Sequence, residues 1–140
     1  VDHALLFLGS RVKKNSATIV VQPDLPRVYG HIPFVEAIIT NLLSNALKYS
    51  RRESPTIEIS GHVDENGRTV FSVKDDGIGI PEDKHEVIFD LLVRLHNHDD
   101  EFDEGYGVGL AVVKKMVERH NGTIEIQSTL GEGTEFIVTI

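Results

Sequence analysis

Apolar residues recur at two different spacings along this chain, and the spacing separates the expected helices from the expected strands. After Pro33 every third or fourth position is apolar, and the same repeat returns over residues 108–120, which is typical of helices packed on one side. Pro33 suits the first turn of the earlier helix, and Asn121-Gly122 ends the later one. A shorter helix is expected over residues 3–14.

Other segments alternate apolar and polar side chains with a period of two, the pattern of half-buried strands. They are residues 18–22, 56–60, 68–73, 123–127 and 134–140. The second and third should form an antiparallel hairpin across residues 64–67, and the last two a closing hairpin. A short extended piece is expected at 27–29 and a short helix near 83–89. These elements predict one α/β domain over residues 1–140, a two-layer sandwich whose mixed, mostly antiparallel sheet has helices on one face.

The first long helix carries a polar stripe beside its apolar face. At about 100° per residue, Asn41, Asn45 and Lys48 fall within roughly 60° of one another. The helix can therefore pack on a sheet and still offer oxygen and ammonium groups to a bound ion and its phosphates. Taken alone, an asparagine on a helix is more often a solvated or capping residue, so the weight of this stripe depends on the motifs that follow.

A second motif, Asp75-Asp76-Gly77-Ile78-Gly79, leaves the strand predicted at 68–73. A buried carboxylate such as Asp75 can accept a hydrogen bond from the exocyclic amine of adenine and so select the base. Gly77 and Gly79 allow the backbone to turn sharply and approach the purine closely. Alone, the motif would be more simply explained as a strand-ending Asp-Gly turn.

A third motif is rich in glycine and opens the second long helix. Gly105, Gly107 and Gly109 lead into first-turn amides that can receive phosphate oxygens, although the same glycines also suit a lid hinge. Their spacing does not fit a dinucleotide-binding fold, and the chain has no Gly-Lys-Ser/Thr phosphate loop. A fourth motif, Gly131-Glu132-Gly133-Thr134, precedes the last strand.

Bulk composition narrows the classes of function. A formal net charge of -8 argues against general affinity for nucleic acid or anionic membranes. With no cysteine, disulfides and zinc-thiolate sites are excluded. No apolar run approaches the roughly 20 residues of a membrane span, so a cytoplasmic location is expected. The first residues read as mid-helix, so residues 1–15 are expected to be the tail of a preceding helical linker in a larger protein, which could itself be soluble or membrane-anchored.

The four motifs, in this order, resemble the ATP-binding catalytic domain of sensor histidine kinases, in the superfamily of gyrase, heat-shock chaperone, histidine kinase and mismatch-repair ATPases. The resemblance covers about residues 24–140, and Asp24-Leu25-Pro26 adds a fainter likeness to phytochrome-like kinases. By this resemblance residues 41–49 are the N box, 75–79 the G1 box, 88–94 the F box and 105–109 the G2 box.

The resemblance implies a role for each matching residue. Asn45 would be a Mg²⁺ ligand and Asn41 would lie near the same ion, with Lys48 and Tyr49 facing the phosphates or the lid. Arg94 would meet the terminal phosphate. His31 stands where the family usually has an aspartate, which is interpreted as a change in helix capping. The nucleotide would also contact Asp75, Gly77, Gly79, Gly105, Gly107, Val108, Gly109, Leu110 and Thr134.

The segment between the F and G2 boxes is acidic and poorly periodic, as expected of a mobile lid. Leu92 and Val93 replace residues that are often aromatic in the family, so a looser lid is expected. His96 and His98 with nearby carboxylates could form a metal cluster, but a solvated charge run is the favoured interpretation. His120 is expected to be structural.

Asn41 also bears on the type of reaction. In hydrolytic relatives this position usually holds a glutamate that activates water, and a carboxamide cannot take a proton. The expected function is therefore to bind Mg-ATP and transfer its γ-phosphoryl group to a histidine on a separate dimerisation domain, with a response regulator downstream. The chain itself lacks the expected phosphoacceptor setting; it should be monomeric, and the full protein a homodimer. The alternatives are an ATP-driven switch or ATPase of the gyrase and chaperone class, and a binding-only domain whose kinase activity has decayed.

Overall fold

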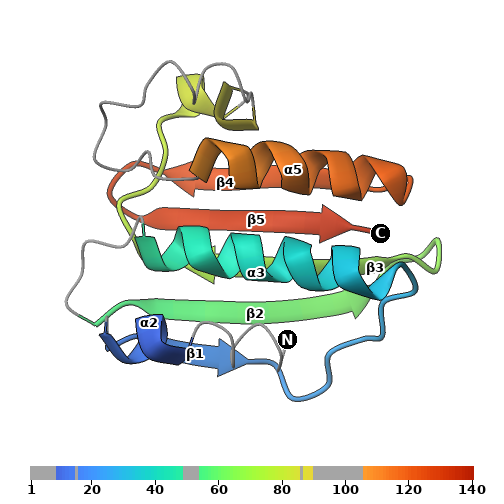
Figure 1. Cartoon of the computed structure of the whole chain (residues 1–140), viewed down its shortest axis with the longest axis horizontal. Coiled ribbons are helices and arrows are strands. Elements are labelled where there is room, and N and C mark those ends of the chain that lie inside the picture. The colour runs from blue at the N-terminus through green and yellow to red at the C-terminus, as the bar shows by residue number, and fades with distance from the viewer. Residues whose placement is uncertain (1–8, 15, 49–53, 86, 90–105) are drawn as a thin grey trace.

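A single sheet forms the base of the molecule, and two long helices lie side by side on one of its faces (Figure 1). The computed structural model describes residues 9–14, 16–48, 54–85, 87–89 and 106–140. The five strands lie in the order β1-β2-β3-β5-β4; β1 pairs in parallel with β2, and every other pairing is antiparallel. The predicted two-layer α/β sandwich is therefore confirmed.

The elements agree with the sequence pattern and are mostly longer than predicted. The strands are β1 (Thr18–Val21), β2 (Thr56–Val63), β3 (Thr69–Asp75), β4 (Thr123–Thr129) and β5 (Gly133–Thr139). The α-helices are α2 (Gly9–Lys14), α3 (Ile32–Lys48) and α5 (Tyr106–Arg119). The expected helix near 83–89 is instead two 3₁₀ turns, Glu82–Lys84 and Val87–Phe89.

The core lies between the sheet and the two long helices. Alternate residues of β2, β3 and β5 face α3 and α5, and the largest fully buried side chains come from both layers. On the other face the row Glu58, Lys74 and Glu135 runs across three neighbouring strands, as expected for an antiparallel sheet covered on one side only. The core residues include Ile38, Leu42, Leu43, Ile57, Val73, Leu110, Val113, Val117 and Val138.

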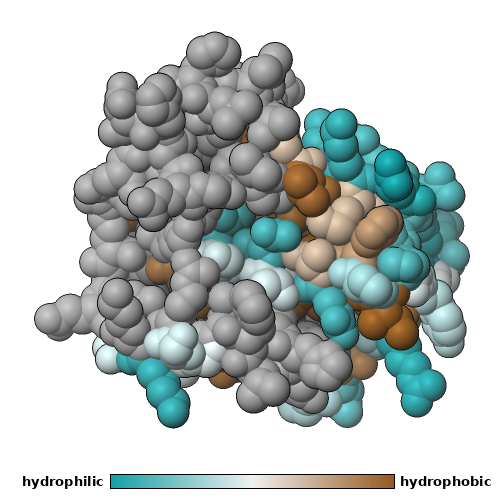
Figure 2. Space-filling model, in the orientation of Figure 1, coloured by the Kyte–Doolittle hydropathy of each residue, from teal (hydrophilic) through white to brown (hydrophobic). Residues whose placement is uncertain are grey.

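The outer surface of the helix layer is mixed in character. Figure 2 shows apolar atoms among polar ones over α3 and α5. Ile32 of α3 and Val112 of α5 contribute exposed apolar side chains.

The predicted extended piece at 27–29 is not a strand, and the end of β1 explains why. The side chain of Gln22 bonds both backbone groups of Gly61, at 2.9 and 3.1 Å, and so occupies the next ladder position of β2. Pro23 has no backbone N–H with which to continue the ladder. The chain therefore leaves the sheet, and the carbonyl of Arg27 accepts a hydrogen bond from the hydroxyl of Thr69 (2.8 Å).

His120 ties the end of α5 to the start of α3. Its Nδ1 lies 2.8 Å from the carbonyl oxygen of Met116, and its Nε2 accepts a hydrogen bond from the backbone N–H of His31 (3.1 Å). The carbonyl of His31 in turn accepts from the amides of Phe34 and Val35, at 3.0 and 3.1 Å, which starts the helix. These contacts give His120 the structural role expected from the sequence. His31 contributes its backbone to the start of α3, while its ring packs against Phe34.

Candidate nucleotide site

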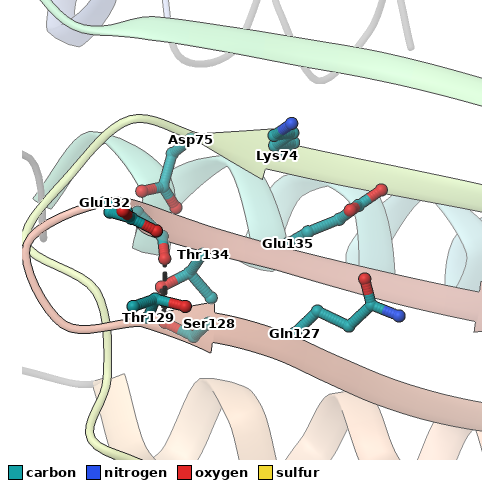
Figure 3. A pocket seen from close by; sticks show the side chains of 9 residues that line it. Lys74, Asp75, Gln127, Ser128, Thr129, Glu132, Thr134 and Glu135 are labelled. Atoms are coloured by element: carbon teal, nitrogen blue, oxygen red, sulfur yellow. Dashed lines mark hydrogen bonds between the residues drawn. The ribbon is translucent and has the colours of Figure 1, made fainter.

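Three polar side chains form one row across the sheet, where β3 and β4 end and β5 begins. Asp75 lies directly opposite Thr134, and Thr134 lies directly opposite Ser128. They share the face of Val73 and Phe136, which is covered by the helices. Asp75 and Thr134 are buried, and Ser128 is half-buried. The sheet therefore presents a short polar floor beside its apolar core (Figure 3).

Burial governs the electrostatics of Asp75. Loss of solvent raises the pKa of this carboxyl from 3.8 to about 6, and the negative charge of neighbouring Asp76 adds to the increase. The backbone amides of Gly77 and Thr134 act in the opposite sense, and the Gly77 amide donates to Oδ1 at 2.8 Å. A further donor aimed at this carboxylate would favour its charged form.

Glycines bring the G1 loop and the β4–β5 turn into contact. A side chain at Gly79 would collide with the backbone carbonyl of Thr129, and one at Gly133 would collide with the carbonyl of Asp75. Both glycines have positive φ angles, 75° and 111°. The amide of Gly131 also donates to the carbonyl of Ile78 (2.6 Å). Gly79 was expected to let the backbone approach the purine; in this structure the close neighbour that it admits is the β4–β5 turn, and the purine contact stays a prediction.

A hollow of about 280 Å³ lies at these strand ends (Figure 3). Its lining joins the three floor residues to a second row that faces away from the helices, Lys74, Gln127 and Glu135. No described residue of α3 or α5 lines it. The hollow therefore lies at the strand ends, between the two faces of the sheet, and we place the candidate nucleotide floor on the helix-covered side, where Asp75 points.

The asparagines of α3 differ in their surroundings. Asn45 is only 4% exposed, and no hydrogen-bond acceptor is found for its Nδ2 within the described part of the chain. Such an unpaired buried donor costs about 1 to 3 kcal/mol. Nδ2 of Asn41 donates to the carbonyl of Ala37 (2.8 Å), so the oxygen is the end of this carboxamide that could meet a ligand. The polar stripe thus holds one buried, unsatisfied amide and one that is fixed by its own helix.

Comparison with known proteins identifies the family. The model of the family described as histidine kinase-, DNA gyrase B-, and HSP90-like ATPases matches residues 30–140. The chain belongs to this family. Within it, the chain is an ATP-binding catalytic domain of the sensor histidine kinase type.

The similar curated proteins of this family are much longer than the chain. Cyanobacterial phytochrome B of Nostoc sp. is 37% identical over 141 residues, which are 100% of this chain and 18% of that protein. The adaptive-response sensory kinase SasA of Synechococcus elongatus is 38% identical over 93% of this chain and 33% of its own length. The chain therefore spans about a fifth to a third of these relatives.

Solved histidine kinase structures share the fold. Full-length ShkA in complex with AMPPNP superposes with a TM-score of 0.81 at 25% identity, covering 99% of this chain and 28% of that one. The mycobacterial sensor histidine kinase MprB has a TM-score of 0.80 at 22% identity, covering 99% and 89%.

Several residues to which the family resemblance gives a role in the site lie outside the described residues. These are Tyr49, Arg94 and Gly105, together with Leu92, Val93 and the histidines of the expected lid. The backbone of Lys48 closes α3, but its side chain is not described. Gly107, Val108 and Gly109 lie in the first turn of α5, which begins at Tyr106, earlier than predicted.

Leu110 was expected to contact the nucleotide, but its side chain is 1% exposed and belongs to the hydrophobic core. Only its backbone amide, at the start of α5, is in a position typical of phosphate contacts. The start of the F box also packs inward, because Ile88 is buried and Phe89 meets Phe136 edge-on with ring centroids 6.1 Å apart.

Sequence reasoning missed Ser128 as part of the site. The alternation of the closing hairpin contained the signal, because it puts residues 124, 126 and 128 on one face, and the turn chemistry of residues 129–133 fixes which residue Thr134 meets. No helix in the described part of the chain is long and apolar enough to cross a membrane. The described residues also contain no group of three or more histidine, aspartate or glutamate side chains suited to hold a metal.

Proposed function

We propose that this domain binds Mg-ATP with its adenine on the Asp75 floor and supplies the γ-phosphoryl group to a histidine of a separate dimerisation domain. The observation that carries the proposal is the buried carboxylate of Asp75, which faces the helix layer and already accepts from the amide of Gly77. The adenine amine would add the donor that stabilises its charged form. Gly77 and Thr134 would flank the base.

Asn45 is the residue we propose to face Mg²⁺ and the phosphates. Its buried Nδ2 lacks an acceptor within the described residues, and a phosphate oxygen would supply one. Half a turn about the last side-chain bond would instead present the carboxamide oxygen to the ion, and oxygen is the ligand that Mg²⁺ prefers. Either arrangement satisfies a group for which the described residues supply no partner. When bound, Mg²⁺ would neutralise charge on the phosphates.

Phosphates and the terminal phosphoryl group would be held by the remaining residues of the motif. We propose that the first-turn amides of α5, at Gly107, Val108 and Gly109, receive phosphate oxygens, as helix N-termini commonly do. Lys48, Tyr49, Gly105 and Arg94 would complete the phosphate contacts, as the family resemblance implies.

The type of reaction follows from Asn41, which can position a water or an ion but cannot act as a general base. In the proposed transfer, an imidazole nitrogen attacks the γ-phosphorus while the bond to the bridging oxygen breaks. ADP leaves, and the imidazole releases a proton from its other nitrogen. Positioning and electrostatics supply most of the rate in such reactions.

The partners follow from the same proposal. Histidine kinase domains of this family work with a dimerisation and phosphoacceptor domain and with response regulators in general. For this protein we propose that both partners act in the cytoplasm and that the full protein is a homodimer.

The test uses the chain with and without an acceptor. The chain alone should bind ATP and release little phosphate, whereas a cognate dimerisation domain should become labelled with acid-labile, alkali-stable phosphohistidine. Steady hydrolysis by the chain alone, abolished by Asp75→Asn, would instead support an ATPase of the gyrase and chaperone class. Tight binding without transfer, even with the acceptor joined in one chain, would support a binding-only domain.

A further inference from the structure

The hydroxyl of Ser128 uses all of its hydrogen-bonding capacity within the protein. Its oxygen accepts from the backbone amide of Ile80 (2.7 Å), and its proton can reach the carbonyl of Gly133 (2.9 Å). The hydroxyl of Thr134 lies 2.9 Å away. Ser128 thus connects the end of the G1 loop, the β4–β5 turn and the polar floor (Figure 3).

Counting protons fixes the direction of these bonds. A serine hydroxyl has one proton to donate and two lone pairs to accept with. When Ser128 donates to Gly133 and accepts from Ile80, one lone pair remains, and the hydroxyl of Thr134 must be its donor. This arrangement satisfies all three contacts of Ser128 at once, which no other direction of the Ser128–Thr134 bond does.

The consequence reaches the neighbouring position in the row. With its only proton donated to Ser128, the hydroxyl of Thr134 presents lone pairs, and no donor, beside the carboxylate of Asp75, whose bond with the backbone amide of Thr134 is already made. The two residues are directly opposite each other on β3 and β5, where such side chains lie about 5 Å apart. The side chains of Asp75 and Thr134 then offer a bound base acceptors only.

We propose that Ser128 is a positioning residue for base selection: by accepting a hydrogen bond from the Thr134 hydroxyl, it makes the floor favour a purine with an amine at position 6 over one with a carbonyl there. This inference rests on the proposed adenine-binding role of Asp75. A carbonyl oxygen, as in hypoxanthine, would meet acceptors and find no donor. Without Ser128 the Thr134 hydroxyl could rotate and donate to that carbonyl, directly or through one water.

The test compares ADP with IDP, the hypoxanthine nucleotide, by calorimetry. Ser128→Ala should reduce the preference for ADP over IDP by up to about tenfold, the effect of one neutral hydrogen bond. Ser128→Thr retains a hydroxyl and should keep the preference. Ser60→Ala serves as the matched control, because it removes one serine–serine hydrogen bond (2.9 Å, to Ser72) from the same sheet on its open face. Its preference should equal that of the natural chain.

A double-mutant cycle of Ser128→Ala and Thr134→Val distinguishes an effect that acts through the Thr134 hydroxyl from a general loss of structure. If Ser128 acts through Thr134, then Ser128→Ala should leave the ADP-to-IDP ratio unchanged once Thr134 has lost its hydroxyl. An equal effect of Ser128→Ala in both backgrounds would overturn the inference, as would an unchanged ratio in the single variant. In both cases the proposed function stands as long as Asp75→Asn weakens ADP binding. If the natural chain binds neither nucleotide, the proposed function itself fails.

Discussion

Gly133 lies directly against the backbone carbonyl of Asp75, so the turn before β5 touches the residue on which the proposed adenine contact depends. A Cβ at position 133 would overlap that carbonyl oxygen, and its φ of 111° is in any case unfavourable for other residues. The backbone of one motif therefore limits the side chains allowed in another that lies more than fifty residues away in the sequence.

Replacing Gly133 by alanine should cost stability and displace Asp75. Gly131→Ala is the matched control, because its φ of 87° is also positive but open space surrounds the added methyl group. The control should lose about 1 to 3 kcal/mol of unfolding free energy from backbone strain alone. Gly133→Ala should lose more and bind ADP more weakly, as measured by urea unfolding and calorimetry. Equal losses in the two variants would show that the contact with Asp75 is unimportant.

Asp75→Asn should weaken ADP binding roughly tenfold to a hundredfold, because a charge-assisted hydrogen bond contributes about 1.5 to 3 kcal/mol. The effect should depend on pH. Because the pKa of Asp75 is about 6 in the folded domain, lowering the pH from 7 to 5 protonates the carboxyl and removes the preferred acceptor. The nucleotide also takes up protons in this range, so the affinity of the natural chain is compared with that of Asp75→Asn at each pH. The ratio of the two affinities should fall about tenfold between pH 7 and pH 5. A constant ratio would contradict the assignment.

Asp75 should also make the unfolding free energy of the ligand-free domain depend on pH. A carboxyl whose pKa is raised on folding, from 3.8 to about 6, stabilises the folded state relative to the unfolded state below pH 3.8, and this contribution is lost as the pH rises through about 6. Over the whole range from well below pH 3.8 to well above pH 6, the natural chain should therefore lose about 3 kcal/mol of unfolding free energy relative to Asp75→Asn. Urea unfolding of both proteins measures the difference. A gap that stays constant with pH would rule out a raised pKa at Asp75.

Asn45→Ala should reduce the part of ATP affinity that depends on magnesium. Removing the carboxamide also removes the unpaired buried donor, so the free energy of unfolding should fall less than for a well-bonded asparagine. Titrations with ATP are compared with and without Mg²⁺ in both proteins. If magnesium increases the affinity equally in the two, Asn45 is not a ligand.

Periodicity predicted most of this fold because the burial pattern follows it closely. The alternation in 68–73 predicted which side chains of β3 enter the core, and the helical repeat after Pro33 correctly predicted the buried face of α3, including Ile38 and Leu42. The extended piece predicted at 27–29 is not a strand of the sheet. The side chain of Gln22 takes the next ladder position by bonding to Gly61, a residue 39 positions away. No local pattern records such a contact.

The candidate site was only partly predictable for a similar reason. Asp75 and Thr134 belong to motifs with recognisable composition. Ser128 belongs to none, and its proposed role comes from the hydrogen bond that it accepts from Thr134 across the hairpin. The family resemblance gives Leu110 a nucleotide contact, and because the helix turns its side chain into the core, that contact stays a prediction for its backbone amide alone. Motif spacing indicates which residues are near a ligand, and packing decides which way they face.

The hydrogen bond between His31 and His120 has a mechanical consequence for the domain. It joins the start of α3 to the end of α5, while the candidate nucleotide floor lies by the opposite ends of these helices (Figure 1). Gly30 leaves no room for a side chain beside the His120 ring, so this junction is tightly packed. The two helices are thus joined at the ends that lie far from the floor. A separation of α3 from α5 around a nucleotide would therefore be a rotation about this junction.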